Sequence, residues 1–465
     1  MGLENQSGLF SGLPTVPMPE PAGRGLPRLR LPIRNQVEVH WLTLDELLPA
    51  EHRARQVWSL VEQMDLSALY RAIKATEGRP GHPPGDPRLL VGLWLYATLE
   101  QVGSARMLER LCREQLGFRW MCGGVSVNYH TLADFRVAHP AVLEDLLTRS
   151  FAACLHSGLA SLDRVAQDGV RVRANAGAAS FRRRQRLADC HALARAELAR
   201  LQTEVHADPA AASRRQRAAQ ERAAREREAR VAEALQVVER LAPKHTAAVP
   251  EAPRHGPDAP PPEPPPTPAS SDAAGKQPRA STTDAEARVM KMADGGFRPA
   301  FNVQFATATK GQLIAAVAIG NVGSDQGRLA PMAEQLAARY GKPPGEMLVD
   351  GGFAKLADIE AVSASGETTV YAPVPKPRDP QRDRHAPVAS DTPKVAAWRG
   401  RMATPQAKTI YKDRAATAEC INALARNRGL QRFPVRGMAK AKAIALWFAL
   451  AHNLARITSL RAATA

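Results

Sequence analysis

Residues 300–319 of the chain read AFNVQFATATKGQLIAAVAI, and this stretch decides the class of fold. Residues 300–306 and 313–319 have the length and apolar content of two β-strands, and Thr309-Lys310-Gly311 between them suits a hairpin turn. Further elements are predicted in the order helix, strand, helix, strand at 328–340, 347–349, 355–364 and 369–374. Strands that alternate with helices in this way predict a mixed α/β core.

The first strand of this core lies earlier in the chain. Val165, Val170 and Val172 sit among polar residues, as the residues of a half-buried strand do. The dipeptide Asp168-Gly169 falls inside this segment. It can be a hairpin turn, because Asp-Gly is a common turn dipeptide, or a strand position with an inward-facing carboxylate.

An insertion follows the first strand. Residues 181–242 are rich in Arg, Ala, Glu and Gln, which predicts a helical hairpin or short coiled coil that is too polar to form a core. Within 243–278 lie 12 of the 37 prolines, so we expect a Pro-rich, disordered linker over 243–283. The core therefore resumes at about residue 284.

The N-terminal part has a different pattern. Residues 1–35 are rich in Pro and Gly and predict a flexible arm, whereas 36–160 have helical periodicity. Helix starts are predicted at Asp86-Pro87, at Ser104 and at a capping box over 131–134. These short helices can form either a helix-turn-helix DNA reader or a plain bundle. At the other end, a Pro-rich and charged loop is predicted over 375–405, followed by helices near 413–428 and 438–460.

Charge points to a polyanionic partner. Among the 465 residues, 63 Lys and Arg against 46 Asp and Glu give a net charge of +17 and a sequence pI near 10.1. The longest apolar runs are shorter than the roughly 20 residues of a membrane span, and no secretory signal opens the chain. The five cysteines are never spaced as Cys-x-x-Cys, which excludes a zinc ribbon and fits a reducing cytosol.

A basic protein that acts on phosphodiesters needs carboxylates to hold divalent metal ions. Asp350 ends an apolar strand and precedes two glycines. The same Asp-Gly-Gly-Phe sequence recurs at 294–297 before a strand, so we interpret Asp294 as a turn residue and Asp350 as a ligand. Glu419 is one of two acids among 12 Lys and Arg in 401–465; it is either functional or a surface acid paired with arginines such as Arg426.

Taken together, these segments resemble the DDE transposases of bacterial insertion sequences, which have an RNase H-like catalytic core. The matching stretches are 86–96, with Arg106, 118–120 and 130–136; 167–175; 296–304 with 323–327; 349–353; and 411–414 with Glu419, Arg426, Gly437 and 452–454. One departure is Arg426, where the related signature usually has Lys; Arg binds phosphate as a planar fork rather than as a point charge.

The resemblance implies a domain plan and a chemistry. It implies a helical DNA-binding domain at 36–160 and an RNase H-like domain at 161–180 and 284–465, with the insertion and linker inside the core. Asp168, Asp350 and Glu419 would be the catalytic, metal-holding triad. Two Mg²⁺ ions, with Mn²⁺ as a possible substitute, would support hydrolysis at the element ends and in-line attack of the freed 3′-hydroxyl on target DNA.

The resemblance also implies partners and location. Double-stranded DNA would be bound by a homodimer or higher oligomer in the cytoplasm, associated with the nucleoid, with no membrane involved. Predicted DNA-binding residues are Tyr411, Arg414, Arg426, Arg136, Arg182 and Arg183, and the last two can equally form a solvated face. Two rival functions remain: a nuclease that cuts without joining, and a non-catalytic DNA-binding regulator derived from a transposase. His452 is expected to be a satisfied buried histidine rather than a ligand.

Overall fold

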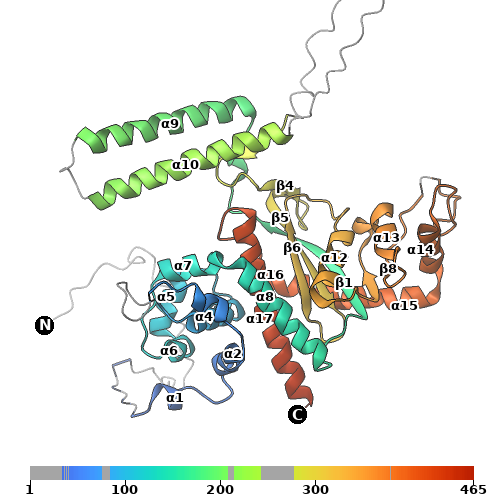
Figure 1. Ribbon diagram of the computed structural model, residues 1–465, viewed down its shortest axis with the longest axis horizontal. Helices are drawn as coiled ribbons and strands as arrows, with labels where there is room; N and C mark the ends of the chain where they lie inside the picture. Colours follow the sequence, from blue (N-terminus) through green and yellow to red (C-terminus); the bar gives the residue numbers. More distant parts are fainter. Residues whose placement is uncertain are drawn as a thin grey trace, which may run out of the picture. The chain divides into compact units, whose positions relative to one another are not determined.

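A mixed sheet built on the stretch 300–319 is the centre of the fold (Figure 1). The computed structural model describes residues 34–464, apart from 36, 38, 40, 76–83, 208–213, 242–276 and 378. Most of the predicted arm at 1–35 and most of the predicted linker lie outside the described residues. Within that part of the chain, Leu44 onward forms one compact unit.

The sheet has the order β4-β5-β1-β7-β8, and β6 also pairs with β5. Its strands are β1 (Arg164–Arg173), β4 (Arg288–Lys291), β5 (Phe297–Ala308), β6 (Ile314–Gly320), β7 (Glu346–Leu348) and β8 (Thr369–Tyr371). β5 runs antiparallel to β1, β4 and β6, whereas β1, β7 and β8 are parallel. The predicted mixed α/β core and its hairpin are therefore confirmed.

The register of β1 against β5 decides between the two readings of Asp168-Gly169. Asp168 lies opposite Phe305 and Gly169 opposite Gln304, both in the interior of the strand pair. The dipeptide is thus part of a strand and not a hairpin turn. Because directly opposed residues of an antiparallel pair share a face, Asp168 shares the face of Phe305 and Gly169 shares the face of Gln304.

Two predicted helices of the core are confirmed, but the prediction of a loop over 375–405 is wrong in part. The confirmed helices are α12 (Leu329–Tyr340) and α13 (Leu356–Ser363). The loop predicted over 375–405 contains α14 (Pro393–Ala403), which begins at the N-cap Thr392 and buries Trp398. Proline suggested a loop there, but proline at the first helical position favours a helix start. The chain then forms α15 (Pro405–Arg414), η3 (Ala415–Glu419), α16 (Cys420–Asn427) and α17 (Met438–Thr464).

The N-terminal part is helical, as predicted. It contains α1 (Leu44–Leu47), α2 (Arg53–Glu62), α3 (Ser67–Arg71), α4 (Pro87–Leu99), α5 (Ala105–Glu114), α6 (Leu116–Cys122), α7 (Tyr129–Ala138) and α8 (Pro140–His156). Asp86 and Ser104 cap α4 and α5 through their side chains. The predicted capping box at Thr131 is wrong, because Asn128 caps α7 by accepting from the Thr131 amide.

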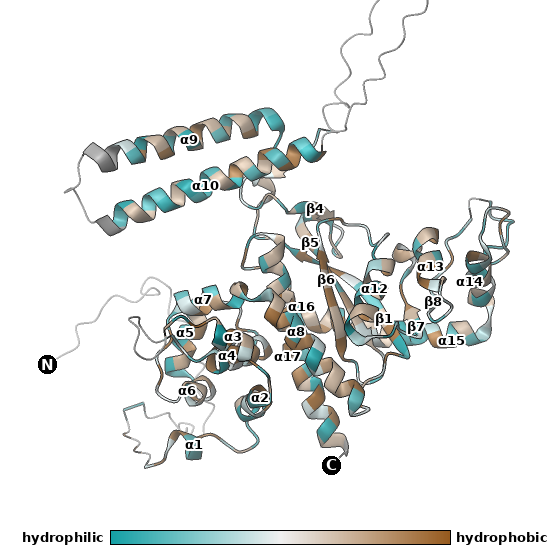
Figure 2. Cartoon of the chain, in the orientation of Figure 1, coloured by the Kyte–Doolittle hydropathy of each residue, from teal (hydrophilic) through white to brown (hydrophobic). Residues whose placement is uncertain are grey.

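The insertion forms the predicted helical hairpin. α9 (Arg184–Ala207) and α10 (Arg214–Leu241) lie side by side and are mostly hydrophilic (Figure 2). They join the remainder of the chain through η1 (Ala178–Ser180), β2 (Phe181–Arg182) and β3 (Ala280–Ser281). The linker was predicted to extend to residue 283, but β3 already lies at Ala280–Ser281, so that end of the prediction is wrong. A small apolar cluster that includes Leu187, Val237 and Val238 anchors the base of the hairpin.

α17 is the central helix of the core. It contacts α4, α7 and α8 from the N-terminal part as well as β5 and β6 of the sheet (Figure 1). Its stretch Met438–Ala463 is long and apolar enough to cross a membrane by length and composition, contrary to the expectation that no stretch is. In this fold 67% of its most apolar window is buried inside the protein. The apolar character of α17 is therefore explained by its place in the core.

Asn453 attaches α17 to the sheet. Its side-chain Nδ2 donates to the Ile314 carbonyl and its Oδ1 accepts from the Ile314 amide, each at 2.8 Å, at a position only 2% exposed. Asn453→Ala leaves both backbone groups of Ile314 unpaired, so we expect the free energy of unfolding to fall by about 2–4 kcal/mol. Urea unfolding measures this. Asn427→Ala, at an exposed position on α16, should change it by less than about 0.5 kcal/mol.

His452 is buried, as predicted, and makes unfolding pH-dependent. Its Nε2 lies 2.9 Å from the Gln312 carbonyl, and burial lowers its pKa to about 4, assisted by Arg428 and Arg456. In the unfolded chain the imidazole titrates near 6.5. Between pH 6.5 and pH 4 the imidazole is protonated in the unfolded state but not in the folded state. The free energy of unfolding should therefore fall as the pH decreases from about 6.5 to 4. His452→Gln keeps a donor without this titration, and urea unfolding at several pH values should show a weaker pH dependence for it.

Candidate active site

Asp168 lies in the middle of β1 and is largely buried. Its side chain is 15% exposed, and its Oδ1 accepts from the Gly169 amide at 2.7 Å. Burial raises the pKa of Asp168 to about 6, and the carboxylates of Asp350 and Asp325 raise it further, against the lowering effects of the Gly169 amide and Arg414. Burial is therefore the main reason that the charged form of Asp168 is disfavoured.

Asp350 follows β7 by two residues, and β7 is the parallel neighbour of β1. Its Oδ1 accepts from the Gly352 amide at 2.8 Å and starts the one-turn helix η2 (Gly351–Phe353). Asp294, in the same four-residue sequence, accepts from the Gly296 amide at 3.1 Å and pairs with Arg298. Asp294 is therefore a turn residue, as predicted, and lies in the turn between β4 and β5.

Glu419 is brought to this region by an irregular helix. η3 is a π-helix, in which hydrogen bonds link residues five apart, so Arg414 and Glu419 come onto one face. The Arg414 guanidinium donates to Glu419 Oε1 at 2.5 Å and to Asp168 Oδ2 at 3.4 Å. Arg414 thus links two of the three acids, and the arginine that pairs with Glu419 is Arg414.

Arg414 is positioned by the Tyr411 ring and by the attachment of its helix, α15, to the sheet. Its side chain, 13% exposed, lies with the guanidinium carbon 5.7 Å from the centre of the Tyr411 ring. Burial raises the pKa of the Tyr411 hydroxyl. Arg164 on β1 pairs with both Glu346 on β7 and Asp413 on α15, which fixes α15 against the sheet. Tyr411 and Arg414 are therefore held beside Asp168 by the fold itself.

The other residues predicted to bind DNA lie elsewhere. Arg426 is exposed on α16, and Arg182 and Arg183 are half-exposed at the base of the hairpin. Arg136 is 7% exposed: its guanidinium lies over the Trp94 ring at 4.6 Å, and burial lowers its pKa to about 10. The structure thus brings Tyr411 and Arg414 to the acids, but it does not bring Arg136 to the surface.

Sequence reasoning missed the place of Asp325. Its carboxylate accepts from the side-chain amides of Asn302 and Gln304 and lies close enough to Asp168 to raise that residue's pKa. The spacing of Asn302 and Gln304, two apart on a strand, puts both on one face of β5. Two amides on the face opposite Phe301 and Phe305 were the signal that could have found this site.

The acids suit a hard divalent cation. Carboxylate oxygens are the ligands that Mg²⁺ prefers. The raised pKa of Asp168 comes first from burial and only then from the carboxylates of Asp350 and Asp325. Within the described part of the chain, no group of three or more His, Cys, Asp or Glu side chains is close enough to hold a metal ion. Instead, Arg414 contacts Asp168 and Glu419, so its guanidinium supplies the positive charge between them.

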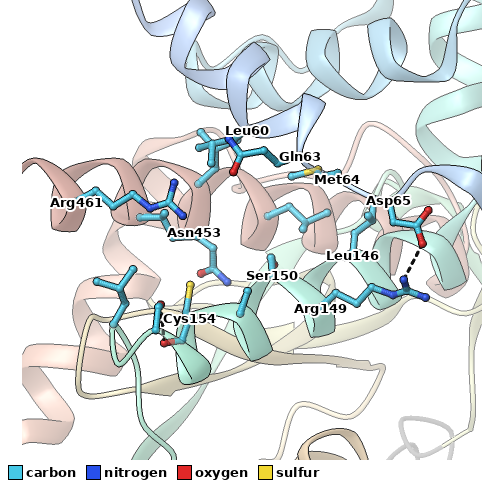
Figure 3. Close-up of a pocket in the computed structure, with 16 residues that line it drawn as sticks. Leu60, Gln63, Met64, Asp65, Leu146, Arg149, Ser150, Cys154, Asn453 and Arg461 are labelled. Carbon is cyan, nitrogen blue, oxygen red and sulfur yellow. Dashed lines mark hydrogen bonds and ion pairs between the residues drawn. The ribbon is translucent and has the colours of Figure 1, made fainter.

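A separate groove of about 340 Å³ lies between α2, α8 and α17 (Figure 3). It is lined largely by apolar side chains such as Leu60 and Leu146, and the Asp65–Arg149 ion pair at 2.8 Å lies at its edge. None of the three acids lines it. The groove is therefore distinct from the candidate active site.

Comparison with known families gives two matches. The family described as "Transposase domain (DUF772)" matches residues 42–138, the N-terminal helices α1 to α7. The family described as "Transposase DDE domain" matches residues 378–458, which include Tyr411, Arg414 and Glu419. No curated protein and no solved structure matches the chain. The two family matches, in this order along one chain, support an insertion-sequence DDE transposase.

Proposed function

We propose that this transposase binds the ends of its own mobile element, hydrolyses phosphodiester bonds there with two divalent metal ions and joins the freed 3′-hydroxyls to target DNA. The observation that carries the proposal is that Arg414 pairs with both Asp168 and Glu419, while Asp350 lies near enough to Asp168 to raise the pKa of that carboxyl. The mixed sheet, with β5 antiparallel to a parallel set of strands, supports an RNase H-like assignment for the core.

Asp168, Asp350 and Glu419 would hold the metal ions. Two Mg²⁺ or Mn²⁺ ions held by these carboxylates would supply activation of the attacking oxygen and stabilisation of the leaving oxygen. The three acids differ in how they are held. Asp168 is largely buried, and the Gly352 amide orients Asp350. The Glu419 side chain is 57% exposed, so it can change its orientation to bind a metal ion. Release of Glu419 from Arg414 would free both side chains, one for metal and one for DNA phosphate.

We propose that Tyr411 and Arg414 contact DNA beside the acids, and that Arg426 on α16 and Arg182 and Arg183 at the base of the hairpin contact it at separate places. The segment 401–465 supports this, because its 12 Lys and Arg greatly outnumber its two acids, Asp413 and Glu419. Buried Arg136 is not one of these contacts. Joining of two ends favours a homodimer or higher oligomer in the DNA complex. The proposed location is the cytoplasm, in association with the nucleoid.

The test is strand cleavage of a labelled duplex that carries the flanking ends of the gene. With Mg²⁺, we expect specific nicks that leave 3′-hydroxyls, followed by products joined to a target plasmid. Tight binding without cleavage in Mg²⁺ or Mn²⁺ would reject the enzyme and leave a regulator. Cleavage without joined products would leave a nuclease.

A further inference from the structure

The loop between β6 and α12 carries a buried carboxylate at the back of the candidate active site. The side chain of Asp325 is 11% exposed. Its Oδ1 accepts from Asn302 Nδ2 and from Gln304 Nε2, both at 2.7 Å. Its Oδ2 lies 3.5 Å from the Arg171 guanidinium. Three side chains from the sheet therefore fix the orientation of this carboxylate.

The strand register explains why these partners converge. Arg171 on β1 lies opposite Asn302 on β5, and Gly169 lies opposite Gln304, so all four share one face of the sheet. Arg171 also donates to the Gly323 carbonyl at 2.7 Å, which fixes the loop at a second point. The loop that holds Asp325 is thus tied to the strand that holds Asp168.

Asp325 occupies the space beside two glycines that neighbour the catalytic acids. A Cβ on Gly169, the residue after Asp168, would lie 2.6 Å from Asp325 Oδ1. A Cβ on Gly352, whose amide orients Asp350, would lie 3.7 Å from Asp325 Oδ2 and 2.9 Å from Asp350 Oδ1. One carboxylate therefore lies against the backbone next to Asp168 and against the turn that orients Asp350.

We propose that Asp325 is a positioning residue that sets the separation of Asp168 and Asp350 for divalent metal binding. It acts through Gly169 and Gly352 and is not itself required to touch the metal or the DNA. Outer groups that hold metal ligands in place typically change metal affinity by about 10- to 100-fold when they are removed. The inference rests on the proposed function, because it assigns Asp325 a role toward the same metal centre.

The experiment measures Mn²⁺ binding to the full chain by isothermal titration calorimetry, without DNA. Asp325→Asn keeps one oxygen acceptor and removes the charge. Gly169→Ala keeps every charge but forces Asp325, Asn302 and Gln304 apart, since its Cβ would meet all three within 2.7 Å. We expect both variants to raise the Kd for Mn²⁺ by about 10- to 100-fold. Gly351→Ala is the matched control, because its Cβ meets nothing within 4 Å, and should leave the Kd unchanged.

Thermal unfolding and DNA binding are measured in parallel to separate positioning from folding. A purely structural role lowers the midpoint of unfolding without changing the Kd for Mn²⁺, and that result would overturn the inference. If Asp325→Asn does not fold, Gly169→Ala decides it. If Asp350→Asn loses Mn²⁺ but neither Asp325→Asn nor Gly169→Ala does, only this inference fails. If wild type binds no Mn²⁺, the proposed metal centre fails as well.

Discussion

Asp350→Asn is expected to reduce Mg²⁺-dependent strand cleavage by about 10³-fold or more, since a ligand to catalytic metal ions stabilises several kcal/mol of transition-state charge. The substitution is isosteric. In wild type, Asp350 Oδ1 accepts from the Gly352 amide at 2.8 Å, and the side-chain oxygen of Asn can accept the same hydrogen bond. The turn should therefore persist while one negative charge is lost. A gel assay with the labelled end duplex measures cleavage, and a parallel filter-binding assay measures DNA affinity.

The chain contains its own control for this variant. Asp294 begins an identical Asp-Gly-Gly-Phe sequence and makes the same type of contact to the Gly296 amide, but its partner is Arg298 in an exposed turn. Asp294→Asn should leave cleavage within about twofold of wild type, because exposed pairs contribute little. Equal losses in both variants would mean that the turn, and not the acid, matters. Full activity of Asp350→Asn would remove Asp350 from the catalytic residues.

The sequence predicted the fold where local signals agreed with tertiary packing. The apolar stretches 300–306 and 313–319, with a turn between them, predicted β5 and β6. Phe301 and Phe305 of β5 pack in the core, and Asn302 and Gln304 face the other side. It failed where proline has two meanings: Pro393 starts α14 in a segment that was predicted as loop. It also failed at Thr131, because α7 begins at Tyr129 and Asn128 caps it by accepting from the Thr131 amide.

The candidate site divides in the same way. Asp350 could be located from its position after a strand, and Asp294 could be set aside because it precedes one. The contact between Arg414 and Glu419 could not be predicted, since residues five apart share a face only in a π-helix, which no local pattern announces. The contacts of Asp325 could not be predicted either, because its partners come from two strands distant in sequence, β1 and β5.

Arg414→Gln is expected to lower the free energy of unfolding in EDTA by about 1–3 kcal/mol, because it leaves buried Asp168 without its cation. The range is below that of a fully buried pair, since Glu419 is 57% exposed and water screens its share of the interaction. Urea unfolding at constant pH measures this. Arg414→Lys keeps the charge but not the planar fork that reaches two acids, so its loss should be smaller.

Magnesium distinguishes compensation of charge from simple packing by Arg414. If the guanidinium occupies the position of positive charge that metal ions fill in the active enzyme, saturating Mg²⁺ should stabilise Arg414→Gln more than wild type, because in wild type the ion competes with Arg414 for Asp168 and Glu419. A packing role predicts the same gain for both proteins, since Mg²⁺ replaces no lost van der Waals contact. An equal gain would therefore reject Arg414 as the compensating cation, and a larger gain in the variant would link the π-helix directly to metal binding.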